Sequence, residues 1–131
     1  MTETLRLAVN GTLMRGLELN KNMQAAHAQF VCETQTEPAY RLWSVDDCYP
    51  AMQRVASGGV AVAVEVWELP LQGLGTILMN EPPGLSIGKV RLKDGEIVLG
   101  VLGEAIACES GKEITRHGGW RAYMRDLETQ R

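Results

Sequence analysis

The chain has 131 residues, 45% of them hydrophobic, and carries a formal net charge of −3 from 13 basic and 16 acidic residues. This length predicts one domain over residues 1–131 with a single core. The negative charge and the lack of any basic run argue against a nucleic-acid partner. No apolar stretch approaches the roughly 20 residues of a membrane span, and the N-terminus lacks the pattern of a signal peptide. We therefore expect a cytoplasmic protein without a membrane partner.

The spacing of apolar residues predicts more strand than helix. The first half of the chain is expected to form a strand through Leu5, Leu7 and Val9, a helix over 21–30 that Asn20 caps, and strands over 40–45 and 60–69. A short helix over 71–79 follows, and then a hairpin of 87–93 and 97–107 around Asp94-Gly95. The chain is expected to end in a charged helix or tail over 125–131. Gly100 and Gly103 indicate a bulge or bend, which is common where sheets close into barrels.

Three cysteines, Cys32, Cys48 and Cys108, lie far apart and form no C-x-x-C pair. This odd and scattered set indicates neither a disulfide framework nor a zinc site. We therefore expect reduced, mostly buried thiols, and neither a metal nor a cofactor.

Two carboxylates, Glu65 and Glu68, close the strand expected over residues 60–69. Strand periodicity sends them to opposite faces, so they cannot form one acid/base pair. With the even-numbered valines in the core, Glu65 is expected to point away from it. Each glutamate is then a solvated or salt-bridged side chain.

A polar turn, Asn10-Gly11-Thr12-Leu13, follows the first strand. Asn-Gly is a common turn dipeptide, which would make this segment a simple reversal of the chain. A turn rich in backbone N–H groups is also suited to holding a carboxylate or an oxyanion. The residues alone leave both interpretations open.

Four sequence blocks carry a resemblance to a known family. They are FVCETQTEPAYRLW at 30–43, VEVWELP at 64–70, PPGLSIG at 82–88 and ITRHGGWRAY at 114–123. In this order, and over nearly the whole chain, they resemble the C-terminal domain of allophanate hydrolases. The resemblance implies an α+β fold similar to the gamma-glutamylcyclotransferase superfamily, which is a mixed β-barrel with a few short helices.

The resemblance also implies a function for the polar turn. In that superfamily the loop after the first strand binds a substrate carboxylate or amide oxygen through backbone N–H groups, and residues 10–13 stand where this loop would be. Asn10 replaces the tyrosine of cyclotransferases. In allophanate hydrolases the loop reads Gly-Ala-His-Leu, and the resemblance implies a catalytic role for its histidine. The residue aligned with that histidine here is Leu13. Because leucine cannot transfer a proton, we do not expect the same decarboxylation by the same residue.

Later blocks supply further candidates for ligand binding. Arg121 either holds a carboxylate in bidentate fashion or pins the C-terminal segment to Glu65 or Glu68. Tyr40 and Tyr123 either donate hydrogen bonds to ligand oxygens or pack in the core with satisfied hydroxyls. The predicted substrate-binding residues are Asn10, Gly11, Thr12, Leu13, Tyr40, Arg121 and Tyr123.

Two side chains are candidate catalytic proton carriers. Glu81 precedes the PPGLSIG block, where the resembling domains tend to have an apolar residue, and it is either an acid/base or a surface carboxylate. His117, beside Gly118-Gly119, is either a second proton carrier or an exposed loop histidine.

Three classes of function remain open. The first is a domain of urea or amide nitrogen metabolism that binds a small carboxylate, ureido or N-carboxy compound, acting as a lyase or decarboxylase or as an accessory to a separately encoded amidase. The second is a cyclotransferase-like enzyme for gamma-glutamyl amines, which requires a buried Glu81. The third is a non-catalytic protein-interaction module. The sequence favours the first class and leaves its catalysis open.

The resemblance implies full enzymes with an amidase domain whose Ser-Ser-Lys residues are missing here, so we expect a stand-alone copy. Exposed strand edges make a homodimer plausible.

Overall fold

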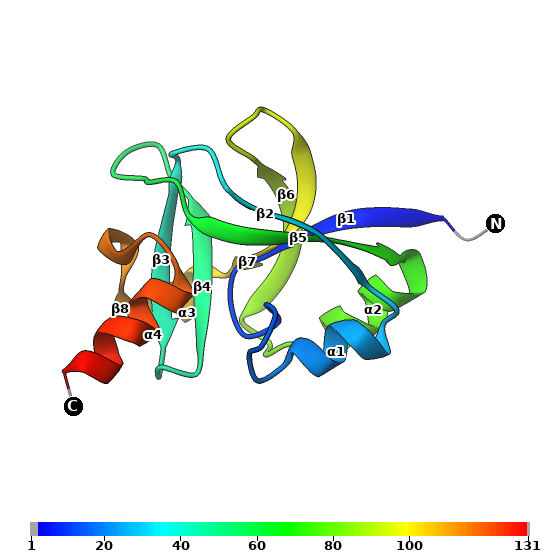
Figure 1. The fold of residues 1–131 in the computed structure, drawn as a ribbon. Coiled ribbons are helices and arrows are strands. Elements are labelled where there is room, and N and C mark those ends of the chain that lie inside the picture. Colours follow the sequence, from blue (N-terminus) through cyan, green and yellow to red (C-terminus); the bar gives the residue numbers. More distant parts are fainter. Residues whose placement is uncertain (1–2, 131) are drawn as a thin grey trace.

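Figure 1 shows the computed structural model, in which residues 3–130 are described. Its strands are β1 (Thr4–Val9), β2 (Gln29–Gln35), β3 (Tyr40–Val45), β4 (Tyr49–Arg54), β5 (Ala63–Pro70), β6 (Leu85–Arg91), β7 (Ile97–Gly103) and β8 (Lys112–Glu113). Its helices are α1 (Asn20–Ala25), α2 (Leu71–Asn80), α3 (Ala105–Glu109) and α4 (Trp120–Thr129), with a 3-10 turn η1 (Thr115–His117). None of these helices is long and apolar enough to cross a bilayer.

The strands form two sheets, one of five strands in the order β2-β5-β1-β7-β6 and one of three strands in the order β4-β3-β8. In the larger sheet β1 runs parallel to β7, and the other pairs are antiparallel. Just beyond β2 and β6, Thr36 and Leu92 form an isolated antiparallel bridge, so these two edge strands meet at one end. The α+β class with mixed strands is confirmed, whereas the closed barrel stays a prediction.

The larger sheet is buried on both faces along its central strands. Leu7 and Val9 of β1 belong to the main core with Trp67 and Leu69 of β5, and Ala8 belongs to a second cluster on the opposite side of the strand. Helices α1 and α2 lie together against the main core, and α3 and α4 lie beside the smaller sheet (Figure 1). Successive strand residues alternate between faces, and both faces are covered, so β5 is apolar on both sides apart from Glu65 and Glu68.

The helix expected over residues 21–30 is shorter in the structure. Helix α1 ends at Ala25, and β2 begins at Gln29. His27 adopts a left-handed conformation with φ 61°, which ends helical geometry. Phe30 therefore lies in a strand, where it packs edge-on against the Trp67 ring.

Two further boundaries differ from the sequence prediction. The strand expected over 97–107 ends at Gly103, because α3 begins two residues later. A Cβ at Gly103 would lie 2.5 Å from the Cβ of Ala51, so this glycine permits close contact between β7 and β4. The C-terminal helix begins at Trp120, so residues 120–123 form its first turn and Gly118-Gly119 lead into it.

The expected burial of the thiols is wrong for two of the three cysteines. Cys108 is buried in α3, but Cys32 and Cys48 are exposed. Cys32 lies on the edge strand β2, and Cys48 lies in the turn between β3 and β4. Neither location is covered by another element, which explains the exposure of both thiols.

Candidate functional site

The loop that follows β1 contains residues 10–13, which we call the cradle. The Asn10 side chain is 3% exposed, and its Nδ2 donates to the carbonyl oxygen of Val101 at 3.0 Å. This side chain therefore anchors the loop to β7. Within residues 3–130, the backbone N–H groups of Gly11, Thr12 and Leu13 have no hydrogen-bond acceptor. Backbone N–H groups without a partner are the feature that a binding loop needs, and ligand binding by the cradle stays a prediction.

The glycine of the cradle is required by a close contact. A Cβ at Gly11 would lie 2.4 Å from Cδ of Pro50, which belongs to β4. The proline ring is rigid and cannot turn away, so only glycine fits here without displacing β4 or the cradle.

A small cavity of about 20 Å³ lies beside the cradle, enough for about one water molecule. Tyr49, Pro50 and Glu81 line it together with all four cradle residues. A groove of about 520 Å³ adjoins this cavity and shares Thr12, Tyr49 and Glu81 with it. The structure thus brings Glu81 to the cradle and provides space for a small molecule next to both.

Glu81 directly follows α2, where Pro82 and Pro83 prevent the helix from continuing. The side chain is half-buried and makes no hydrogen bond or ion pair within the described part of the chain. Desolvation by burial raises the pKa of its carboxyl group. A carboxyl group with a raised pKa retains its proton closer to neutral pH, which is the property that a general acid needs.

Tyr49 is a candidate site residue that the sequence did not single out. It lines both the cavity and the groove. Burial raises the pKa of its hydroxyl, and the negative charges of Asp46, Cys48 and Glu81 raise it further. The phenol therefore remains a hydrogen-bond donor beside Glu81. No local pattern marks this residue, because its contact with the cradle joins segments that are far apart in the chain.

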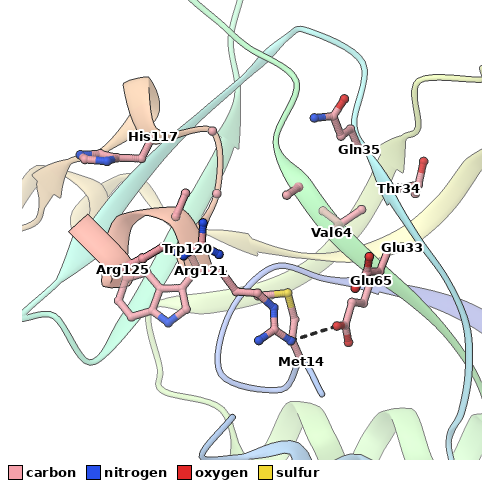
Figure 2. Close-up of a pocket in the computed structure, with 14 residues that line it drawn as sticks. Met14, Glu33, Thr34, Gln35, Val64, Glu65, His117, Trp120, Arg121 and Arg125 are labelled. Carbon is pink, nitrogen blue, oxygen red and sulfur yellow. Dashed lines mark hydrogen bonds and ion pairs between the residues drawn. The ribbon is translucent and has the colours of Figure 1, made fainter. Parts of the chain in front are cut away.

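Arg121 lies in a different cavity, of about 480 Å³, between the first turn of α4 and strands β2 and β5. Figure 2 shows Arg121 reaching across it to Glu65. Its Nη2 donates to Glu65 Oε2 at 3.1 Å and to the carbonyl oxygen of Arg15 at 2.6 Å. The pinning contact considered from the sequence is therefore present, and carboxylate binding by Arg121 stays a prediction.

Glu65 is buried, with 2% of its surface exposed, although the sequence analysis expected it to point away from the core. The reason is that both faces of β5 are covered. Desolvation alone would raise the pKa of Glu65, but hydrogen bonds from the backbone N–H of Arg15, the Trp67 indole and the side chains of Arg15 and Arg121 outweigh it. The pKa is therefore lowered and the group stays ionised.

His117 lines the Arg121 cavity and is not among the residues beside the cradle. Its Nδ1 lies 2.6 Å from Asp126 Oδ2, and its ring packs edge-on against Tyr123. The two candidate proton carriers, Glu81 and His117, thus line separate cavities.

The two candidate tyrosines are packed in the protein. Tyr40 is fully buried, and its hydroxyl accepts a hydrogen bond from the Arg91 backbone N–H at 3.2 Å. Tyr123 is 2% exposed, and its hydroxyl donates to Asp47 Oδ1 at 2.5 Å. Neither tyrosine lines the cradle cavity, the groove or the Arg121 cavity, so their ligand contacts stay predictions.

Together these features define a small α+β domain in which an N–H-rich loop and a carboxyl group share one cavity. The model of the allophanate hydrolase C-terminal domain family matches residues 5–125. The chain belongs to this family. Within residues 3–130, no cluster of three or more His, Cys, Asp or Glu side chains is arranged to hold a metal ion.

Several known proteins are similar to this chain. Urea amidolyase of Saccharomyces cerevisiae is 30% identical to this chain over 95% of the chain's length. The matched region covers only 7% of the length of that enzyme. A crystal structure of a uropathogenic E. coli-specific protein is 56% identical, with a TM-score of 0.91 over 93% of this chain and 96% of that one. Kluyveromyces lactis allophanate hydrolase is 27% identical, with a TM-score of 0.89 over 95% of this chain and 22% of that one.

The fold is also similar to that of a gamma-glutamyl cyclotransferase, with a TM-score of 0.54 over 85% of this chain and 70% of that one. The identity is 12%, so this likeness concerns the fold alone. It supports the fold relationship that the sequence resemblance implied.

Proposed function

We propose that this domain binds a small carboxylate, ureido or N-carboxy compound of urea or amide nitrogen metabolism, and that Glu81 donates a proton to it. One observation carries the proposal: Glu81, with its raised pKa, lines the same cavity as the unpaired N–H groups of Gly11, Thr12 and Leu13. Membership of the allophanate hydrolase C-terminal domain family and the likeness to a urea amidolyase support the choice of metabolism.

The cradle would bind the ligand through negatively charged oxygen. The N–H groups of Gly11, Thr12 and Leu13 donate to one carboxylate, as in an oxyanion hole, and the rest of the ligand occupies the adjoining groove. In a decarboxylation, the carbon–nitrogen bond of an N-carboxy group breaks, its electron pair remains on nitrogen, and carbon dioxide leaves. The proton of Glu81 passes to that nitrogen. This assigns to Glu81 the proton transfer that Leu13 cannot perform.

A cyclotransferase-like activity on gamma-glutamyl amines is the second candidate. It requires a carboxyl group beside the cradle, and Glu81 meets this requirement. In either case, we propose a cytoplasmic domain that acts alone, as a homodimer, or together with a separately encoded amidase that supplies the N-carboxy compound.

The test is ligand binding followed by turnover. We expect malonate, a stable dicarboxylate, to raise the unfolding temperature, because a ligand at 100 times its dissociation constant adds roughly 2.7 kcal/mol to stability. 5-Oxoproline and a gamma-glutamyl amide distinguish the cyclotransferase alternative. Release of carbon dioxide is then measured with an amidase that forms the N-carboxy compound in the same solution.

Two variants separate binding from proton transfer. Glu81→Gln keeps the shape of the side chain, so malonate binding should persist while carbon dioxide release falls by 100-fold or more, in line with the roughly 10²- to 10⁴-fold contribution of a general acid. Glu96→Gln, which removes only the surface ion pair with Arg6, is the control. Full turnover by Glu81→Gln would refute the proton-transfer role, and the lack of any thermal shift would refute the binding site.

A further inference from the structure

We propose that Glu65 is a positioning residue for the cradle, acting through Arg15 and Arg121. This inference rests on the proposed function of the cradle. We call these three residues the clamp. None of them lines the cradle cavity, yet together they fix the chain two residues after the cradle ends.

Both backbone groups of Arg15 are held by the clamp. The Arg15 N–H donates to Glu65 Oε1 at 2.9 Å, and the Arg15 carbonyl oxygen accepts from Arg121 Nη2 at 2.6 Å. A peptide segment that is fixed at both its donor and its acceptor has little freedom to rotate. The clamp therefore sets the direction of the chain as it leaves Leu13 and Met14.

The side chain of Arg15 reinforces this arrangement. Its Nε donates to Glu65 Oε2 at 3.2 Å, its Nη2 pairs with Glu33, and its guanidinium lies 3.7 Å from the centre of the Phe30 ring. Trp67 Nε1 donates to Glu65 Oε1 at 3.1 Å. Each carboxylate oxygen of Glu65 thus accepts two hydrogen bonds, and the group ties the loop to β2, β5 and α4.

The geometry of the loop passes this constraint to the cradle. The Met14 N–H donates to the Gly11 carbonyl oxygen at 3.0 Å, and the Leu19 N–H donates to that of Thr12 at 2.9 Å. The first bond closes a tight turn and the second spans the loop, so the two bonds join Gly11 and Thr12 to Met14 before Arg15 and to Leu19 beyond it. A shift of Arg15 would therefore rotate the backbone N–H groups of the cradle. A donor site works only while its N–H groups keep their orientation toward the ligand oxygen.

Burying a carboxylate is costly unless donors compensate it, and a well-packed apolar residue would stabilise the same location without that cost. The four hydrogen bonds do more than balance the charge, since two of them come from a loop that otherwise lacks regular structure. The clamp thus accounts for both the charged core residue and the fixed loop.

The experiment compares Glu65→Gln with Glu113→Gln, a matched variant that removes the Arg41–Glu113 ion pair on the smaller sheet. The readouts are the amide chemical shifts of Gly11 and Thr12 in the free protein and the dissociation constant of malonate. We expect Glu65→Gln to move both amide signals and to weaken malonate binding by at least 10-fold. Glu113→Gln should change neither quantity.

Each outcome decides between the two proposals. Unchanged Gly11 and Thr12 signals in Glu65→Gln would overturn the clamp. If the wild-type protein binds no carboxylate but Glu65→Gln still moves both signals, the proposed function fails while the positioning role stands. Should Glu65→Gln not fold, Arg121→Met tests the same point, because it frees the Arg15 carbonyl group and leaves the Arg15 N–H bonded to Glu65. Unmoved amide signals in that variant would equally overturn the clamp.

Discussion

Leu13 and Met14 are neighbours in the chain but line two different cavities, Leu13 the cradle cavity and Met14 the cavity of Arg121. The loop therefore separates the cradle cavity from the Arg121 cavity. This relationship explains why the candidate residues that line a cavity divide between two cavities. Glu81 lines the cradle cavity, whereas Arg121 and His117 line the other cavity.

Adding one methyl group at Gly11 should damage the cradle. In Gly11→Ala the new Cβ would meet the Pro50 ring at 2.4 Å, and we expect a loss of about 1–3 kcal/mol of unfolding free energy, as for other overpacked sites. Malonate binding should weaken as well, because the cradle or β4 must shift. Urea unfolding and calorimetric titration measure the two effects.

A matched glycine provides the control for this change. Gly75 lies within α2, and nothing lies within 4 Å of a Cβ built there. Gly75→Ala should therefore stabilise the protein by up to about 1 kcal/mol through helix propensity and leave binding unchanged. Equal effects of the two alanines would contradict the close contact between Gly11 and Pro50.

Glu81 should make stability depend on pH in a defined direction. Its pKa is raised by burial, so the folded protein holds this proton more tightly than the unfolded chain. Its contribution favours folding at low pH and is lost as pH rises from the unfolded pKa through the folded one. Compared with the wild type, Glu81→Gln should gain unfolding temperature across that window. A constant difference between pH 4 and pH 8 would show that the carboxyl group titrates normally.

Glu65 should have the opposite effect at acid pH. Its pKa is lowered in the folded protein, so its contribution to stability is complete above the unfolded pKa and is lost as pH falls through the folded pKa. In Glu65→Gln this acid-dependent loss should disappear, and at neutral pH we expect a deficit of about 2 kcal/mol from lost charged hydrogen bonds. Urea unfolding at a series of pH values provides the measurement. Parallel stability curves for the two proteins would argue against an ionised Glu65.

The three thiols should react at different rates. Cys32 and Cys48 are exposed, whereas burial first, and then the charge of Glu109, raises the pKa of Cys108 to about 11. Because the thiolate is the reactive form, Ellman's reagent at pH 8 should modify two thiols rapidly and the third only after unfolding. Three equal rates in the folded protein would contradict the burial of α3 against the smaller sheet.

The sequence by itself determined the α+β class, the family and the polar turn that follows the first strand. These follow from local information: strand periodicity, a polar Asn-Gly turn after an apolar strand, and four blocks in a fixed order. It also singled out Glu81, but left open whether this residue is an acid/base or a surface carboxylate. The sequence could not determine the length of α1, because the left-handed His27 and the close packing of Gly73 against Ala26 involve backbone geometry and contact with α2.

Only the tertiary structure decided which candidates share a site. Glu65 looked like a surface residue because alternation assigns a strand two faces but does not say that both are covered. Its donors Arg15 and Arg121 lie 50 and 56 residues away in the chain. Tyr49 belongs to the smaller sheet but lines the cavity beside the cradle, which follows a strand of the larger sheet. Such contacts depend on how the elements pack, and no pattern within a single segment contains that information.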